Sequence, residues 1–271
     1  MSHFLELHVK GEPLLMPNPW DAGSARVLAS LGFRALATTS AGFANTLGRS
    51  DGSVTRDEAL AHSAAVVAAV DVPVSADLEN GFADDPHGVA KTVRKAAGVG
   101  LAGCSIEDST GRVDDPIYSI GHATERVAAA VEAAGHGFVL TARAENFLHG
   151  RTDLAETIAR LQKYQEAGAH VLYAPGITTA EQIRAVVSSV DRPVNVLALP
   201  GVPPVSELAE LGVARISVGS GFALTALGAL VEAGRELLDQ GSYGFWQRAG
   251  TGSDVARKAF STDRIPSRQH S

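Results

Sequence analysis

One pattern constrains the fold of this chain more than any other: short apolar runs, suited to strands, alternate with longer segments of helical spacing. Such alternation is typical of βα units in a parallel sheet. The expected strands are Leu14–Trp20, Ala35–Ser40, Pro73–Glu79, Gly103–Asp108, Phe138–Glu145, Val171–Ala174, Val194–Ala198 and Arg215–Gly219. The expected helices are Ala22–Leu31, Arg56–Val70, Gly88–Gly98, Ala123–Ala134, Leu154–Ala167, Ala180–Ser189, Val205–Leu211 and Ala223–Gln240, with Asp153 and Thr179 as N-caps. Eight such pairs in about 240 residues predict a closed (β/α)8 barrel.

The predicted domain organisation is an α/β barrel over residues 1–241 and a C-terminal extension over 242–271. The extension is expected to be partly helical, with a short helix at 256–260 and a frayed end. A doubly wound open sheet is the alternative, because periodicity alone does not prove closure. No GxGxxG opens the first helix, which counts against a dinucleotide-binding version of that sheet.

Composition narrows the classes of partner. The net charge is −7 and the pI is about 5.7, so no basic surface is expected for nucleic acid or an anionic membrane. No apolar run is long enough to cross a bilayer. The single cysteine, Cys104, excludes an internal disulfide, and no export signal precedes the first strand. We therefore expect a cytoplasmic protein that acts on small molecules.

Acidic residues gather where the expected strands end. Asp77 and Glu79 share one face of the third strand, and Glu107 faces the same way from the fourth, because side chains alternate along a strand. Neither strand carries a basic residue. Three acids in a barrel interior are costly unless they are paired or bind a cation, so a hard divalent ion, Mg²⁺ or Mn²⁺, is predicted. Histidine spacing does not support zinc.

Six motifs, read in order, make the chain resemble a known superfamily. They are Asn18-Pro-Trp-Asp21, Thr39-Ser-Ala-Gly42 with Leu47-Gly-Arg-Ser-Asp51, Ala76-Asp-Leu-Glu-Asn-Gly-Phe82, Ser105-Ile-Glu-Asp108, Ala142-Arg-Ala-Glu145 and Val194-Asn-Val-Leu197. Together they are similar to the isocitrate lyase/phosphoenolpyruvate mutase superfamily. The resemblance implies a (β/α)8 barrel, a dimer or tetramer that often exchanges a terminal helix, and Mg²⁺-dependent chemistry on α-keto or α-hydroxy acids.

The resemblance also implies residue roles. Asp77 would bind the metal directly, with Glu79 and Glu107 binding directly or through water. Arg143 would hold the substrate carboxylate with a bidentate fork. Further substrate contacts would come from the backbone amides of Ser40, Ala41 and Gly42 and from Trp20, Asp21 and Asn195. Asp51 lies where mutases carry a loop aspartate that handles the migrating group, although a solvated turn residue is an equal alternative.

Three departures from the superfamily pattern shape the functional prediction. The chain lacks the Lys-Lys-Cys-Gly-His loop of the isocitrate-cleaving lyases, and strand parity directs Cys104 away from the site. Phosphoryl-handling members carry lysine after Ile-Glu-Asp, where this chain has Ser109, and Arg112 is the nearest substitute. The second acid of the metal motif is Glu79, where many relatives have Asp. Apart from these departures, His149 and Arg151 follow the fifth strand, where a solvated loop is favoured over a role in substrate selection.

The resulting first hypothesis is a Mg²⁺-dependent lyase that makes or breaks a C–C bond in a small α-keto or 2-hydroxy acid through an enolate, as in oxaloacetate decarboxylase or methylisocitrate lyase. Phosphonate or phosphoenolpyruvate mutase chemistry, or phosphonopyruvate hydrolysis, is the enzymatic alternative. A non-catalytic barrel that binds a carboxylate is the alternative from another class.

Overall fold

The computed structural model describes residues 3–261, and eight parallel strands form its central sheet. The strands are β1 (Leu14–Met16), β2 (Leu36–Ala37), β3 (Val74–Asp77), β4 (Gly103–Glu107), β5 (Val139–Arg143), β6 (Val171–Tyr173), β7 (Val194–Leu197) and β8 (Arg215–Ser217). Their order is β1-β8-β7-β6-β5-β4-β3-β2. The Ala37 amide donates to the Pro17 carbonyl (3.1 Å), which joins the two outer strands and nearly closes the barrel. The open-sheet alternative is thereby excluded.

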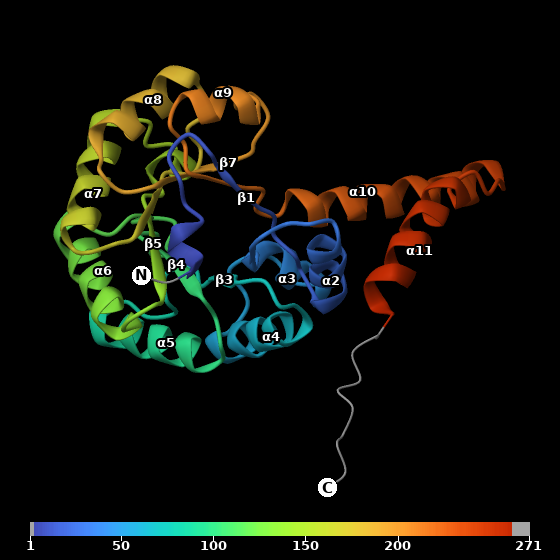
Figure 1. Ribbon diagram of the computed structural model, residues 1–271, viewed down its shortest axis with the longest axis horizontal. Coiled ribbons are helices and arrows are strands. Elements are labelled where there is room, and N and C mark those ends of the chain that lie inside the picture. Colours follow the sequence, from blue (N-terminus) through green and yellow to red (C-terminus); the bar gives the residue numbers. More distant parts are fainter. Residues whose placement is uncertain (1–2, 262–271) are drawn as a thin grey trace, which may run out of the picture.

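Helices surround this barrel as a ring (Figure 1). The helical elements are α1 (His3–Glu6), α2 (Ala22–Ser30), α3 (Ser40–Thr46), α4 (Arg56–Ala69), α5 (Pro86–Gly98), α6 (Ile120–Ala134), the 3-10 turn η1 (Asn146–His149), α7 (Leu154–Glu166), α8 (Ala180–Ser189), α9 (Val205–Glu210), α10 (Gly221–Arg235), the π-helical turn η2 (Glu236–Gln240) and α11 (Trp246–Phe260). Of these, α1, α10, η2 and α11 lie outside the ring. The eight expected strands are all present, although each is shorter than predicted. Among residues 3–261, no helix has both the length and the apolar character that a membrane span requires.

Local sequence signals start several of these helices. Thr179 accepts a hydrogen bond from the Gln182 amide, and the Gln182 side chain accepts one from the Thr179 amide, which forms a capping box at α8. Asp153 accepts from the amides of Ala155 and Glu156 at the start of α7. Both predicted N-caps are confirmed.

The strands separate two environments by side-chain parity. Residues such as Ala76, Ile106 and Leu140 face the helices and belong to the main apolar core, together with helical residues such as Val93 and Val127. The intervening positions carry polar side chains into the barrel. This alternation places the helix packing on one side of each strand and the candidate site on the other.

The N-terminal segment covers one end of the barrel. Phe4 of α1 is 2% exposed and packs in a second apolar cluster with Leu14, Val139 and Val171. Gly103 permits this approach, because a Cβ there would overlap the Val139 carbonyl and crowd the Phe4 ring. His8 is also buried, and its Nδ1 lies 3.0 Å from the Phe4 carbonyl.

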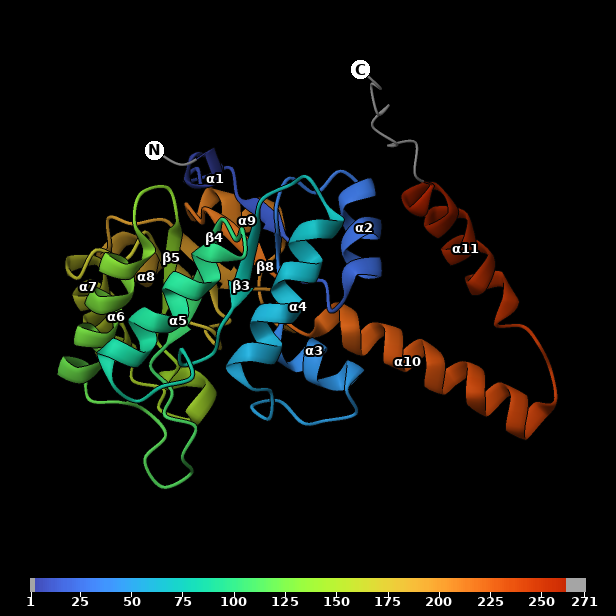
Figure 2. The same cartoon turned by 90° about the horizontal axis from the view of Figure 1, so that it is seen from below.

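The C-terminal helices project from the barrel as an arm (Figure 2). Helix α10 leads away from β8, and α11 turns back so that it contacts α2. The predicted short helix at 256–260 is the last part of α11, while the predicted frayed end lies outside the described residues. Exposed apolar side chains run along α10 and η2, namely Phe222, Leu224, Leu227, Leu230, Val231, Leu237 and Leu238. The arm therefore carries an apolar face that the barrel does not cover.

Candidate functional site

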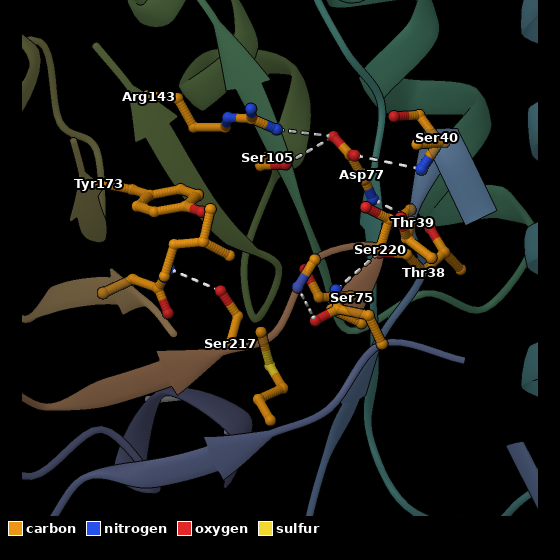
Figure 3. A pocket seen from close by; sticks show the side chains of 18 of the residues that line it. Thr38, Thr39, Ser40, Ser75, Asp77, Ser105, Arg143, Tyr173, Ser217 and Ser220 are labelled. Carbon is orange, nitrogen blue, oxygen red and sulfur yellow. Dashed lines mark hydrogen bonds and ion pairs between the residues drawn. The ribbon is translucent and has the colours of Figure 1, made fainter. Parts of the chain in front are cut away.

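A cavity of about 160 Å³ opens at the carboxyl ends of the strands. Asp77, Arg143, Leu197 and Ser217, which end β3, β5, β7 and β8, all line it. Figure 3 shows that Arg143 and Ser40 approach Asp77 from opposite sides. The cavity therefore occupies the end of the barrel at which the sequence predicted the site.

Asp77 is held by donors from three neighbouring elements. Its Oδ1 lies 3.0 Å from Nη1 of Arg143 and accepts a hydrogen bond from the Ser105 hydroxyl at 3.4 Å, and its Oδ2 accepts one from the Ser40 amide at 3.2 Å. The backbone amide of Asp77 donates to the Thr38 hydroxyl (3.0 Å). These bonds fix the carboxylate in the cavity wall.

Arg143 is surrounded by three carboxylates. The Nε–Nη2 edge of its guanidinium binds Glu145 in bidentate fashion at 2.9 and 3.2 Å. The Nη1–Nη2 edge lies against Asp77 at 3.0 Å and Glu107 at 3.1 Å. Both bidentate edges are therefore occupied, which differs from the expectation that the fork is available to a substrate carboxylate. A substrate reaches Arg143 only through the remaining Nη1 hydrogen or by displacing an acid.

The cluster consists of the acids Asp77, Glu79, Glu107 and Glu145 and the single cation Arg143, and the pKa values of Glu79 and Glu107 are raised. Burial, with a further contribution from the charge of Asp77, raises the pKa of Glu79 to about 7. Burial also raises the pKa of Glu107 well above its ordinary value, although Arg143 opposes the shift. Glu79 adopts φ +49°, a left-handed conformation that non-glycine residues rarely take and that often marks functional sites. The cluster is thus short of positive charge.

The expected convergence of Asp77, Glu79 and Glu107 on one metal is not seen. Among residues 3–261, no three acidic, histidine or cysteine side chains form a ready-made metal site. Arg143, from the neighbouring strand, lies between Asp77 and Glu107 and supplies the cation that those strands lack. Oxygen donors and surplus negative charge nevertheless suit Mg²⁺ or Mn²⁺, and the arrangement fits binding in which some acids act through water.

The predicted substrate contacts divide into two groups. Ser40, Ala41, Asp51 and Asn195 line the cavity. The other three, Trp20, Asp21 and Gly42, are not among its lining residues. The side chain of Asp21 accepts from the Ser24 amide at 2.6 Å and caps α2, so local helix capping explains its position.

The three predicted amide donors are also not equally available. Ser40 donates its amide to Asp77, and Gly42 donates its amide to the Thr39 hydroxyl at 3.3 Å. Of the three, Ala41 alone has an amide without a hydrogen-bond acceptor in the part of the chain that the structure describes. A substrate carboxylate at this position would therefore meet fewer donors than the motif suggests.

The structure adds cavity residues that the sequence analysis did not select. Tyr173 ends β6, and Arg215 and Ser217 lie on one face of β8. Strand parity could have found Arg215 and Ser217, because they stand two positions apart at the end of an expected strand. Their role depends on neighbouring strands, which the sequence does not identify.

Four residues to which the sequence assigned no firm role lie outside the cavity, namely Cys104, Arg112, His149 and Arg151. Cys104 is fully buried among the helix-facing residues, and burial raises the pKa of its thiol, which confirms the inert-core interpretation. Arg112 pairs with Asp84 at 3.4 Å and Asp115 at 3.6 Å on an exposed loop. His149 and Arg151 are exposed and do not line the cavity either.

Fold and site together define a TIM-type α/β barrel with a charged cavity at the carboxyl ends of its strands. A family model described as phosphoenolpyruvate phosphomutase matches residues 4–238, so the chain belongs to this family. The 2-methylisocitrate lyase of Escherichia coli (strain K12) is 30% identical over 194 residues, which cover 68% of this chain and 65% of that protein.

Solved structures agree with this assignment. A protein from Burkholderia cenocepacia J2315 is 52% identical, with a TM-score of 0.92 over 96% of this chain and 95% of the other. The 2,3-dimethylmalate lyase, described as a member of the PEP mutase/isocitrate lyase superfamily, is 27% identical, with a TM-score of 0.78 over 94% of this chain and 95% of the other. The chain is therefore placed in a superfamily of lyases and mutases.

Proposed function

We propose that this protein is a Mg²⁺-dependent lyase that makes or breaks a C–C bond in a small α-keto or 2-hydroxy carboxylic acid. The observation that carries the proposal is the acidic cluster at the cavity: Asp77 and Arg143 line the cavity, Glu107 and Glu145 pair with the same arginine, and Glu79 adds a fourth acid beside Asp77. Such an arrangement is costly to bury and is suited to holding a divalent cation. The names of two relatives, 2-methylisocitrate lyase and 2,3-dimethylmalate lyase, support the same reaction class.

In this proposal each residue has a defined task. Asp77 would hold the cation directly, while Glu79 and Glu107 would bind it directly or through water. A bound divalent ion would polarise the keto or hydroxyl oxygen and stabilise negative charge there. The Ala41 amide, the remaining Arg143 hydrogen and Asn195 orient the acid, and Asp51 at the cavity rim positions it or moves a proton.

Phosphoryl transfer is less well supported. The cation that the mutase alternative needs after the Ile-Glu-Asp motif would have to be Arg112, which is instead paired with Asp84 and Asp115 outside the cavity. A silent carboxylate-binding barrel is also disfavoured, because binding alone gives no reason to gather three acids around one arginine with a fourth beside them.

A turnover screen tests the proposal. Purified protein is assayed with oxaloacetate, 2-methylisocitrate, related 2-hydroxy acids and phosphonopyruvate, each with MgCl₂ and with excess chelator. We expect C–C cleavage of at least one carboxylic acid that chelator abolishes. Turnover of phosphonopyruvate alone would replace the lyase by the mutase or hydrolase alternative, and no turnover of any acid would favour the binding barrel.

Asp51→Ala separates the two enzymatic alternatives further. In a lyase, loss of a residue that positions the substrate or moves a proton should reduce the rate by a factor on the order of 10²–10⁴. In a phosphoryl-transfer enzyme with Asp51 as the transfer partner, turnover should vanish. Asp191→Ala, which removes an exposed aspartate in the turn between α8 and β7, serves as the matched control and should keep the parental rate.

We also propose that the protein acts in the cytoplasm and self-associates through its arm. The apolar side chains of α10 and η2 are exposed in the single chain, with Leu230 at 67% and Leu238 at 85%. A second copy of this arm is a suitable cover for such a face. Light scattering should show a dimer or tetramer for the parent protein and a smaller species for Leu230→Glu. A parent protein that is monomeric in solution would refute this proposal.

A further inference from the structure

A second buried arginine in the cavity wall differs from Arg143 in its partners. Arg215 of β8 is 3% exposed and lines the cavity. Its Nε donates to the Asn195 side-chain oxygen at 2.9 Å, its Nη2 donates to the Thr141 hydroxyl at 3.0 Å, and its Nη1 lies 3.2 Å from Nε2 of His8. The side chains of Asn195 and Thr141 carry no charge, and His8 is neutral because burial lowers its pKa to about 3.

The positive charge of Arg215 is therefore not neutralised by direct contact. Within residues 3–261 no ion pair joins this guanidinium to a carboxylate, whereas Arg143 contacts three. Burial lowers the pKa of Arg215 to about 10, which still leaves it protonated at neutral pH. A buried cation without a counter-ion is costly, and that cost is reduced when an anion binds.

Hydrogen-bond capacity supports the same conclusion. A guanidinium has five N–H groups, and the three contacts of Arg215 use one on each nitrogen. One N–H on each terminal nitrogen is then available to a ligand. Arg143 has both bidentate edges occupied by acids, so Arg215 is the arginine of this wall with more donor capacity for an incoming anion.

We propose that Arg215 is a specificity-determining residue that binds a second anionic group of the substrate, so that the cavity selects dicarboxylates over monocarboxylates. The inference rests on the proposed function, because the first carboxylate and the adjacent oxygen are those of the α-keto or 2-hydroxy acid. Asn195 holds Nε of Arg215 and is itself fixed by donating to the Ser217 hydroxyl at 2.9 Å. Arg215 is therefore presented to the ligand in a defined orientation.

The test compares acids that differ by one carboxylate. Oxaloacetate is paired with 2-oxobutanoate, and malate with 2-hydroxybutanoate, so that a methyl group replaces the second carboxylate. Affinities are measured by calorimetry with MgCl₂ on the full chain for the parent, Arg215→Gln and Arg215→Lys. Arg184→Gln, an exposed arginine on α8, is the control for a change of net charge.

The parent should bind the better dicarboxylate at least about tenfold more tightly than its methyl counterpart. Arg215→Gln should weaken dicarboxylate binding by about 30-fold, the loss expected when one partner of a buried charged pair is removed. Monocarboxylate binding should change less than about threefold. Arg215→Lys should retain part of the selectivity because the charge remains, and Arg184→Gln should match the parent.

Two results would contradict the proposed role of Arg215 and would leave the proposed lyase function unaffected. Equal affinity of the parent for both members of each pair would show that no second anion is recognised, and this measurement does not depend on a variant that folds. Equal losses for both acids in Arg215→Gln would assign Arg215 to the positioning of Asn195. If the parent bound none of these acids and turned over none in the screen, the proposed function and the inference would both fail.

Discussion

The two acids at the end of β4 lie on opposite sides of the barrel wall. Glu107 faces the interior, where it lies 3.1 Å from Arg143 in a cluster that has more carboxylates than cations. Asp108 faces α7, where Arg160 at 3.1 Å and the Tyr164 hydroxyl at 2.5 Å contact the same carboxylate oxygen. The last residue of β4 and the residue that follows it therefore lie in two different electrostatic environments.

The contrast shows how a charged cluster for ligand binding differs from one for stability. At Asp108, burial raises the pKa, but donors from Tyr164, the Glu145 amide and Arg160 each lower it. At Glu107, burial and neighbouring acids act together against Arg143 alone. In the outer cluster, formed by Asp108, Arg160 and Tyr164, the protein's own donors oppose the cost of burial. In the inner cluster, formed by Asp77, Glu79, Glu107, Glu145 and Arg143, the carboxylates outnumber the cations.

The largest expected effect is that of Asp77→Asn on the inner cluster. Mg²⁺-dependent turnover should fall by a factor on the order of 10³ or more, because a charge that holds the cation is lost. The melting temperature without metal should stay equal or rise, since repulsion among the acids decreases. Calorimetric Mg²⁺ titration and thermal unfolding measure both, with Asp191→Asn as control. If Asp77→Asn kept full activity and the parental Mg²⁺ affinity, the proposed Mg²⁺ dependence would be wrong.

Asp108→Asn should act on stability instead. Asn places an NH₂ group among donors, and Arg160 loses its buried counter-ion, so the free energy of unfolding should fall by about 3 kcal/mol. Denaturant unfolding measures this loss. Turnover per folded molecule should fall much less than in Asp77→Asn. A stable Asp108→Asn protein without activity would contradict the division into two clusters.

Glu79 gives the inner cluster an expected pH dependence. Because Mg²⁺ competes with a proton on a carboxyl of pKa about 7, affinity should increase about tenfold between pH 6 and pH 8. Without metal the raised pKa stabilises the folded state at low pH, and this contribution is lost as pH rises from about 4.5 through about 7. Glu79→Gln should reduce both slopes, while the exposed Glu132→Gln should keep them.

The smallest effect is expected for Cys104→Ser on the helix-facing side. Turnover should remain near the parental value, and burial of the hydroxyl should cost about 1 kcal/mol of stability. Activity assays and denaturant unfolding are sufficient to check this. Inactivation of the parent by a thiol reagent, with protection by substrate, would show that Cys104 reaches the site.

The sequence by itself determined the barrel and the direction of its polar side chains. Eight βα units, the caps at Asp153 and Thr179, and the inward orientation of Asp77 follow from periodicity and local hydrogen bonding, which act between residues close in the chain. The same parity separated Glu107 from Cys104. The superfamily motifs also marked Arg143 and Asp51 as cavity residues before the fold was known.

Only the tertiary structure decided which charges meet. Arg143 lies against Asp77 across a sequence separation of 66 residues, and Arg215 reaches Thr141 across 74. Such contacts depend on the register and curvature of the closed sheet, and no short-range pattern encodes them. Barrel closure therefore surrounds one arginine with three carboxylates and leaves the other with neutral partners, and that difference in electrostatic environment separates their proposed roles.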